Sequence, residues 1–510
     1  MAGSDRSYPE QHLDVMAVGS AFDALFRRPT GVAEWPPTQV VYLRDYVSKL
    51  DCRTAVIERH YVDRDFIHDV AVLYARSLRG YPNYCQRLHL FRSEFDEIRW
   101  RQLVVSARAP EERARAEAEL NDAYLGFIVV KPLPGVPVGR TVLRTWGPKN
   151  AVGHDREFPA IRPYQVHLGP FRLGVEGLAF QQQDSGVSAC ATTALWSALH
   201  RVAHVEGLAT RTPAEITEAA SRYVLADGRA LPSEGLSIDQ VCEAIRGADL
   251  SPLLLWPVDR DQDIGQITGY LQSGFPVVLG LKGINADTGA DGHAVCVTGL
   301  KLAPLRPQTD ASLHCIDGAT RVRSLFIHDD RLGPYAVADI HPWTEADTGK
   351  TRTAIWIKWP DNDKTEADHC LLTAIIVPVP IKLRLTVGRL RELALAIAEN
   401  VGAQFPEAGG HAVFHCRFER SSDYRQRALG FGLTDEAVFD ISCRSVLSRY
   451  IGLIEVSSKE GVPLLDVLLD STETDPNPAI LNWVKRSGLP ASARGWLDKI
   501  SEVLGGHLFW

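Results

Sequence analysis

Apolar residues recur every three or four positions in several stretches of the chain, and this spacing is typical of amphipathic helices. The clearest example is residues 188–204, SACATTALWSALHRVAH, in which Leu195, Leu199 and Val202 share one helix face. The other stretches that predict helices are residues 41–50, 62–80, 109–124, 235–247, 263–274, 385–402 and 477–488.

Shorter apolar runs bounded by Gly, Pro or charged residues predict strands. These runs are residues 124–135, 139–143, 275–281, 293–300, 324–330, 353–359, 370–380, 450–458 and 463–472. Between residues 171 and 380, a strong helix comes first and β-rich sequence follows. This order is typical of an α+β fold.

The same patterns divide the chain into regions. Residues 1–35 are polar and turn-rich, and we predict a flexible arm there. Residues 36–150 form an N-terminal α/β region of unknown function, and the segment 145–170, rich in Gly, Pro and His, is predicted to be a linker. A central domain over residues 165–381 and a C-terminal α/β region over residues 382–510 complete the chain.

One charged run lies inside the N-terminal region. Glu58-Arg59-His60 is followed closely by Asp63-Arg64-Asp65. Such a run usually lies on the solvated face of a helix, so we predict an exposed helix face, with docking of a substrate or partner as the alternative.

Composition narrows the class of protein. The chain has 510 residues, of which 45% are hydrophobic and 23% charged, which is the balance of a soluble globular protein. The formal charge of −8 makes a dominant nucleic-acid or anionic-membrane role unexpected. We also expect no secretory signal and no membrane span, because the longest apolar stretch, residues 371–381, is short and interrupted. Nine scattered cysteines without a CxxC pair favour reduced thiols in a cytoplasm.

The segment FQQQDSGVSACATTAL places a cysteine at the opening of a helix. If Ser188 is the N-cap, Cys190 lies in the first turn, where free backbone N–H groups and the helix dipole favour a thiolate. Gln183 precedes the cysteine by seven residues, and its amide is suited to donate to a developing oxyanion, with Gln182 as the alternative.

A cysteine nucleophile requires a base and a group that orients that base. His293 begins the strand HAVCVTGL directly after a Gly-containing turn. Asp329 ends the strand SLFIHD, which can pair with the His293 strand and bring the carboxylate beside the imidazole. Asp317 is a rival, and Asp330 is adjacent but is predicted to point to the opposite face, because neighbours on a strand alternate.

Taken in order, these residues resemble the papain-like cysteine peptidases. The match is closest to the bacterial subgroup similar to bacteriocin-leader (double-glycine) processing peptidases, through QQDSGVSACATTAL, SGFPVVLGL, GHAVCVTGL and FIHDDRLGPY. The resemblance covers roughly residues 171–380. It implies a helix that carries the cysteine, packed on an antiparallel sheet that carries His293 and Asp329. The 36-residue gap between these two residues implies an insertion near LKLAPLRPQTDA.

The resemblance implies a cysteine hydrolase that cleaves a peptide or isopeptide bond in a protein or peptide substrate. A glutamine deamidase or a transglutaminase-type acyl transferase would use the same residues, and a non-catalytic scaffold is the alternative outside enzymes. No cofactor is expected. No metal site is expected either, because adjacent pairs such as His328-Asp329 point to opposite faces of a strand. A protein partner for the N- or C-terminal region is a further expectation.

Overall fold

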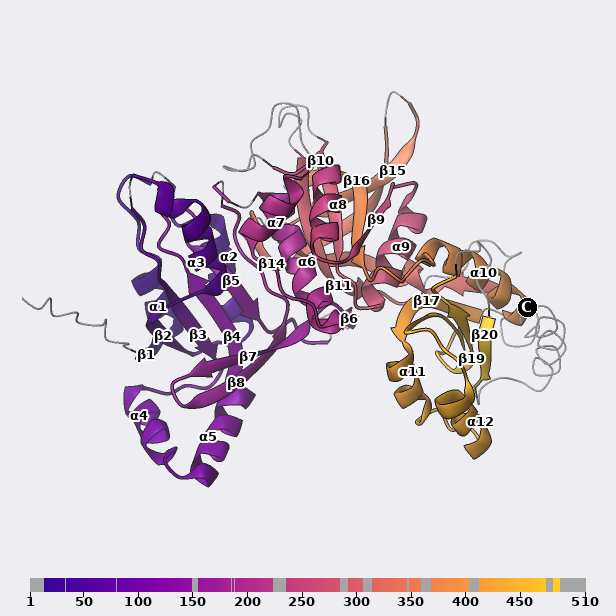
Figure 1. Ribbon diagram of the computed structural model, residues 1–510, viewed down its shortest axis with the longest axis horizontal. Coiled ribbons are helices and arrows are strands. Elements are labelled where there is room, and N and C mark those ends of the chain that lie inside the picture. Colours follow the sequence, from indigo (N-terminus) through magenta and orange to yellow (C-terminus); the bar gives the residue numbers. More distant parts are fainter. Residues whose placement is uncertain are drawn as a thin grey trace, which may run out of the picture.

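The computed structural model describes residues 13–32, 34–78, 80–148, 155–184, 186–187, 189–222, 235–284, 292–305, 314–345, 348–358, 368–402, 412–473 and 480–486. In the described residues, three larger antiparallel or mainly antiparallel sheets and one two-stranded hairpin are formed, and helices cover the larger sheets (Figure 1). The structure is therefore a mixture of α and β elements, in which helices pack against the sheets.

The N-terminal unit is a five-stranded antiparallel sheet in the order β1-β2-β3-β4-β5. Its strands are β1 (Leu13–Ala17), β2 (Thr54–Tyr61), β3 (Cys85–Phe91), β4 (Tyr124–Val130) and β5 (Val138–Leu143). Its helices are α1 (Val18–Leu25), α2 (Thr38–Lys49), α3 (Arg64–Val72), the single turn η1 (Tyr74–Arg76), α4 (Glu97–Ser106) and α5 (Pro110–Ala123).

The predicted flexible arm is wrong for its described part. Strand β1 pairs with β2, and in α1 the side chains of Ala21 and Phe22 are fully buried. These few apolar residues provide enough buried surface to hold the segment on the sheet, although the residues around them are polar. Residues 1–12 of the arm lie outside the described residues.

The predicted solvated helix face at Glu58 to Asp65 is also wrong. Glu58 lies on strand β2 and is buried, and its carboxylate pairs with Arg87 of the neighbouring strand at 2.7 Å. Asp63 is buried as the N-cap of α3, where it accepts from two backbone N–H groups, and it pairs with Arg140 at 2.7 Å. Glu58 and Asp63 each have a cationic partner, which offsets the cost of burying their charges. Asp65 is buried as well, and burial together with the charge of Asp63 raises its pKa to about 6.

The segment predicted to be a linker contains regular structure. Strand β7 (Arg162–Leu168) forms a hairpin with β8 (Phe171–Gly177), and the short strand β6 (Asp155–Glu157) pairs with a strand of the central sheet. The hairpin alternates buried and exposed residues, so one face of it packs on the N-terminal unit. Residues 149–154 of the predicted linker are outside the described residues.

The central unit is built around a closed six-stranded antiparallel barrel. Around the barrel the order is β10-β11-β13-β14-β15-β16, and pairing of β10 with β16 closes it. The strands are β10 (Val277–Gly283), β11 (Gly292–Leu302), β13 (Val322–Asp329), β14 (Gly333–Thr344), β15 (Thr351–Ile357) and β16 (Asp368–Val379), with β9 (Ser251–Leu255) added beside β16. The helices are α6 (Cys190–Glu206), α7 (Pro213–Ala220), α8 (Ile238–Gly247) and α9 (Arg260–Gln272).

Helix α6 is the central helix of this unit. It packs on β11 and also contacts β10, β13 and β16 of the barrel and helices α7 and α8 (Figure 1). Trp196, Leu195 and Leu199 are 0–1% exposed. The contacts of α6 with strands and helices hold the helix, and so its first residue Cys190, in a fixed position.

The C-terminal unit is a five-stranded sheet in the order β12-β17-β18-β19-β20. Its strands are β12 (Cys315–Asp317), β17 (Ala412–Arg420), β18 (Tyr450–Ser458), β19 (Pro463–Asp470) and β20 (Ile480–Lys485). Its helices are α10 (Val387–Gly402), α11 (Ser421–Ala428) and α12 (Asp435–Phe439), and the short turns η3 (Gly318–Arg321) and η4 (Asp440–Arg444) follow β12 and α12.

Two predictions for this unit are wrong. The helix predicted over residues 477–488 is strand β20 in its described part, because pairing with β19 satisfies its backbone and overrides its helical spacing. The domain boundary at residue 381 is crossed by β12, which follows the predicted insertion after β11 and pairs parallel to β17.

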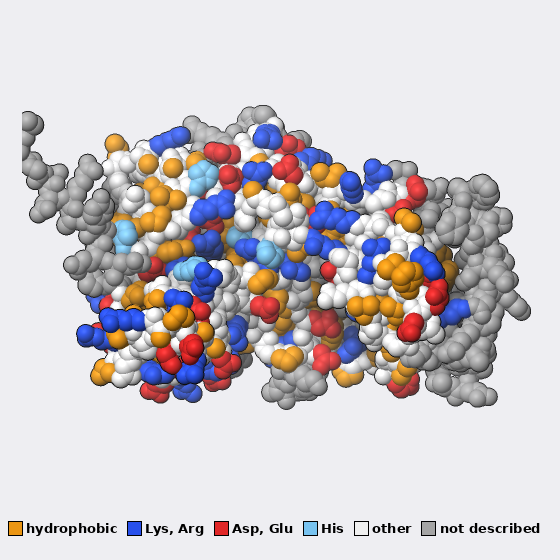
Figure 2. Space-filling model, turned by 60° about the horizontal axis from the view of Figure 1, so that its bottom comes forward, with side chains coloured by type: hydrophobic (Ala, Val, Ile, Leu, Met, Phe, Trp, Pro, Cys, Tyr) orange, Lys and Arg blue, Asp and Glu red, His pale blue; other side chains and the backbone are white. Residues whose placement is uncertain are grey.

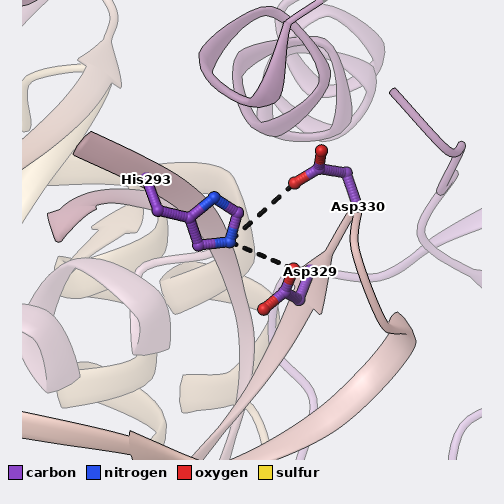
Figure 3. Close-up of side chains that lie close together, drawn as sticks. All are labelled: His293, Asp329 and Asp330. Carbon is purple, nitrogen blue, oxygen red and sulfur yellow. Dashed lines mark hydrogen bonds and ion pairs between the residues drawn. The ribbon is translucent and has the colours of Figure 1, made fainter. Parts of the chain in front are cut away.

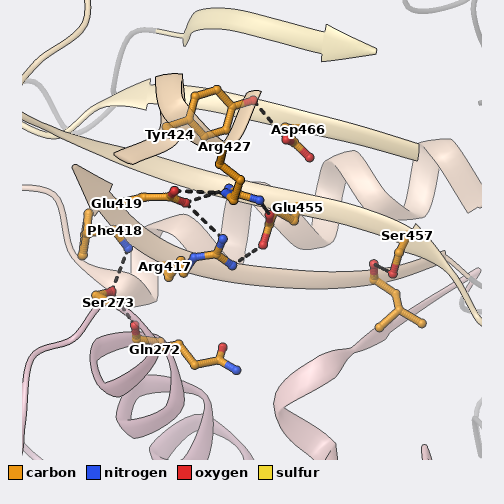
Figure 4. A network of polar contacts seen from close by, with 12 residues as sticks. Gln272, Ser273, Arg417, Phe418, Glu419, Tyr424, Arg427, Glu455, Ser457 and Asp466 are labelled. Carbon is orange, nitrogen blue, oxygen red and sulfur yellow. Dashed lines mark hydrogen bonds and ion pairs between the residues drawn. The ribbon is translucent and has the colours of Figure 1, made fainter. Parts of the chain in front are cut away.

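A polar network fastens the C-terminal sheet to the central unit (Figure 4). The Phe418 N–H of β17 donates to the Ser273 hydroxyl at the end of α9, at 2.7 Å. Within the C-terminal unit, Arg427 of α11 bridges Glu419 of β17 at 2.7 Å and Glu455 of β18 at 2.8 Å. These side chains are partly buried, so the ion pairs are less screened by water than exposed pairs are.

The surface carries charges of both signs. On the face in Figure 2, Lys and Arg side chains alternate with Asp and Glu over all three units. No helix in the described part of the chain has both the length and the apolar character needed to cross a bilayer.

Candidate active site

Cys190 is the first residue of α6. Its N-cap is Ala189, in an extended conformation and without a side-chain capping bond, while Ser188 lies outside the described residues. The Cys190 side chain is partly exposed, in contrast to the buried thiols of the central barrel. The sulfur therefore lies at the positive end of a long helix, where a negative charge is stabilised.

His293 is the second residue of β11, and its side chain is 6% exposed. Its Nε2 atom lies 3.0 Å from Oδ1 of Asp329, the last residue of the neighbouring strand β13 (Figure 3). Cys190 also interacts with the His293 side chain, and this interaction contributes to the raised pKa of His293. Since Nε2 faces Asp329, Nδ1 is the ring nitrogen left for the sulfur. The structure thus brings together the thiol, the imidazole and the carboxylate from α6, β11 and β13.

The electrostatics of this group favour a protonated imidazole. Burial disfavours the imidazolium, but the charge and hydrogen bond of Asp329, together with the Cys190 contact, outweigh burial and raise the pKa of His293 to about 10. Burial alone would raise the pKa of Asp329, yet His293 and Arg331 lower it. The pair is therefore an ion pair at neutral pH, with the cation next to the thiol.

Asp330 does not point away from the site as predicted. Its Oδ1 lies 3.9 Å from His293 Nε2, on the same side as Asp329. The reason is that β13 ends at Asp329 after a register irregularity opposite β14, so strand alternation does not extend to Asp330. Burial and the neighbouring Asp329 raise the pKa of Asp330 to about 7.

The rival residues lie elsewhere or have other partners. Asp317 ends β12 in the C-terminal sheet and pairs with Arg391 at 2.5 Å, so it is not a partner of His293. The Gln182 amide accepts from the Val138 N–H at 3.3 Å and donates to the Gly135 carbonyl at 3.2 Å. Gln183 is half-buried in the same segment, and it is the glutamine whose amide is not tied to that turn.

One group of side chains has the composition of a metal site. His293, Asp329 and Asp330 offer ligand atoms that lie within 4.8 Å of one another, and all three residues are buried. One imidazole and two carboxylates suit a divalent cation such as Zn²⁺. The Nε2 atom that would bind the ion is, however, already hydrogen-bonded to Asp329, so the geometry fits a hydrogen-bonded triad without a metal.

Sequence reasoning missed the part of the site that comes from the N-terminal unit. Gln39 and Tyr42 of α2 contact the turn after β13, and Tyr74 of η1 hydrogen-bonds to Asp184, just before α6. These polar residues stand in ordinary helical sequence, and only the tertiary structure reveals their contacts.

The His293–Asp329 pair predicts how stability depends on pH. Because the pKa of His293 is raised from 6.5 to about 10, the folded protein keeps a proton that the unfolded chain loses above pH 6.5. The stability that this proton contributes is complete below pH 6.5 and is lost as pH rises through about 10. Asp329, with its lowered pKa, contributes stability that is lost in acid instead.

We therefore compare wild type with Asp329→Asn by urea denaturation. Between pH 6.5 and 10, the free energy of unfolding of wild type should fall by at least about 1 kcal/mol more than that of the variant. Parallel pH profiles for the two proteins would contradict an ion pair between His293 and Asp329.

Comparison with known protein families and with curated protein sequences gives no match to this chain.

Proposed function

We propose that the protein is a cysteine hydrolase of papain-like type that cleaves a peptide or isopeptide bond. The observation that carries this proposal is that His293 hydrogen-bonds to Asp329 and interacts with Cys190, which begins α6. A nucleophile, a base in contact with it and a carboxylate behind the base are the three parts that thiol catalysis needs.

In the proposed reaction, the Cys190 thiol has already given its proton to the His293 imidazole, whose raised pKa favours the imidazolium, and the resulting thiolate attacks the carbonyl carbon of the substrate. The tetrahedral intermediate collapses to a thioester as the bond to the amine breaks, and His293 returns the proton to the leaving nitrogen. Water then attacks the thioester, with His293 accepting its proton, and the free thiol and a carboxylic acid are restored.

The oxyanion has two candidate donors. The Cys190 N–H is one of the first N–H groups of α6, which have no partner inside a helix. The Gln183 side chain supplies the second donor in this proposal, since Gln182 is held by Gly135 and Val138. Preorganised donors of this kind are worth about 3–4 kcal/mol each in acyl transfer.

Asp329 orients the base. By accepting from Nε2, it keeps Nδ1 directed at the sulfur and stabilises the imidazolium that forms when the thiol loses its proton. The Asp329 oxygen that faces Nε2 also accepts from the Arg331 N–H at 2.9 Å. The carboxylate is thus fixed by the turn as well as by the histidine.

The test is selective alkylation of Cys190 with iodoacetamide at pH 6, with peptide mapping by mass spectrometry. Cys443 is an internal control, because it is an exposed cysteine on a different unit. We expect Cys190 to react at least about tenfold faster than Cys443 although it is less exposed, because a neighbouring imidazolium favours the thiolate.

The matched variant is His293→Ala. It should remove the advantage of Cys190 and leave the rate at Cys443 unchanged. If Cys190 reacts no faster than Cys443 in wild type, the thiol is not activated and the hydrolase proposal fails in favour of a non-catalytic scaffold. Products then separate the acyl-transfer reactions: a new N-terminus indicates peptide cleavage, and release of ammonia indicates a deamidase or transglutaminase.

A further inference from the structure

Helix α2 of the N-terminal unit contacts the turn that carries the site carboxylates. The Gln39 side chain donates through Nε2 to the Asp330 carbonyl at 2.8 Å, and the Tyr42 hydroxyl donates to the Pro334 carbonyl at 2.8 Å. Gln39 and Tyr42 are 8% and 7% exposed, so both bonds are shielded from water. The two bonds bracket the turn between β13 and β14.

Packing fixes the same turn. A Cβ atom on Gly333 would lie 2.1 Å from a ring carbon of Tyr42, so the ring fills the space that a side chain would need. The turn and α2 are therefore in direct van der Waals contact as well as hydrogen-bonded. The turn can move away from its present position only if α2 moves with it or if both bonds break.

The position of this turn decides where the Asp329 carboxylate lies. The Arg331 N–H donates to Asp329 Oδ1 at 2.9 Å, and the Leu332 N–H donates to the Asp329 carbonyl at 2.9 Å. The carboxylate is thus part of the turn, and it meets His293 Nε2 only while the turn keeps this conformation. A fixed turn therefore holds in place the Asp329 carboxylate, which is the acceptor of the His293 hydrogen bond.

The N-terminal unit also holds the other side of the site. Thr141 of β5 exchanges two backbone hydrogen bonds with Phe180, at 2.7 and 2.9 Å, and the Gln182 N–H donates to the Val138 carbonyl at 3.1 Å. The segment that leads through Gln183 to Cys190 is thereby attached to the edge of the N-terminal sheet. One unit contacts both the nucleophile side and the carboxylate side.

We infer that α2 is a positioning element of the catalytic centre, in which Gln39 and Tyr42 hold the Asp329 turn against His293 and make activity depend on the docked N-terminal unit. The inference rests on the proposed function. Neither residue touches the reacting atoms, so both act through Asp329.

The charged groups around His293 and Asp329 determine how the pKa of His293 would change if the turn moved. Cys190 faces the imidazole from α6, while Asp330 and Arg331 face it and Asp329 from the turn. Tyr42 of α2 is a neutral donor, because burial and nearby carboxylates raise the pKa of its hydroxyl. If Asp329 moves away, the main group that stabilises the imidazolium is lost, and the pKa of His293 should fall.

The variants are Tyr42→Phe, Gln39→Met and the double variant, which remove the hydrogen bonds and keep the side-chain volume. Tyr46→Phe is the matched control, because Tyr46 lies on the same helix and donates to the Arg144 carbonyl at 2.8 Å, away from the turn. The readouts are the rate of Cys190 alkylation from pH 4 to 10 and the His293 imidazole titration by NMR.

We expect the double variant to show a His293 pKa about one unit lower than wild type, and to lose the imidazolium-dependent alkylation of Cys190 at a pH about one unit lower as the pH rises toward 10. Tyr46→Phe should match wild type in both measurements, and thermal unfolding checks that the variants are folded. Tyr42→Phe, which loses a single oxygen, should show the same direction of change if the double variant unfolds.

Two failures are distinguishable. If wild-type Cys190 reacts no faster than Cys443, the proposed function fails. If wild-type Cys190 is activated but the α2 variants have the alkylation rate and the His293 titration of Tyr46→Phe, the proposed function stands and the positioning role of α2 is overturned.

Discussion

Replacing Cys190 by alanine should abolish hydrolysis and leave the fold intact. Loss of the nucleophile in a triad costs at least about 10³-fold in turnover, because no other group forms the thioester. The cost in stability should be about 1 kcal/mol, since the residue is small, partly exposed and at the end of a helix. The measurement is mapping of new protein N-termini in a lysate treated with wild type or with Cys190→Ala.

Replacement of a different cysteine by alanine serves as the control for this variant. Cys443→Ala alters an exposed thiol on the C-terminal unit and should cleave as wild type does. If Cys190→Ala retains the cleavage pattern, Cys190 is not the nucleophile. If Cys190→Ala unfolds at a temperature well below that of wild type, Cys190 is a packing residue, and loss of activity would not support a catalytic role for it.

Asp329→Asn should reduce turnover by about 10⁴-fold, by analogy with triads in which the same change disturbs the histidine tautomer. The amide keeps the size of the carboxylate but carries no charge, so His293 loses the group that holds Nε2 as a donor. Turnover of the substrate identified by N-terminal mapping is the measurement, at a pH between 6 and 8.

Asp317→Asn is the matched control for this variant. Asp317 pairs with Arg391 in the C-terminal unit. Asp317→Asn should therefore change turnover by no more than a few-fold. It should lower the stability of the protein, because one partner of a partly buried ion pair is removed. A large loss of turnover in Asp317→Asn together with normal turnover in Asp329→Asn would exclude the assignment of Asp329.

The sequence could predict the local parts of the site because each depends on a short pattern. Cys190 begins a helix whose apolar face is evident from the spacing of its apolar residues, and His293 lies at the start of a strand that is rich in β-branched residues. The pairing of the His293 and Asp329 strands was predicted from the apolar character of SLFIHD, which ends at Asp329, and it is confirmed. Neighbouring strands in an antiparallel barrel then bring their ends together.

Other features depend on tertiary contacts that no local pattern records. Strand β1 was predicted to be part of a flexible arm because residues 1–35 as a whole are polar and turn-rich, yet β1 pairs with the edge of β2. The residues of β20 were predicted to form a helix, but they form a strand that pairs with β19. Asp330 was predicted to point away, but the strand ends one residue before it. In each case the neighbouring element overrides the residue's own preference.

Strand β12 has a consequence for how the chain is completed during synthesis. It is made with the barrel, between β11 and β13, but its parallel neighbour β17 begins only at Ala412. A ribosome that has just released the barrel strands therefore leaves β12 with both edges unpaired until β17 is made. An open strand edge invites pairing with other chains. Nascent chains that stall in this interval should be prone to association, and residues 382–510 made alone would lack the first strand of their sheet.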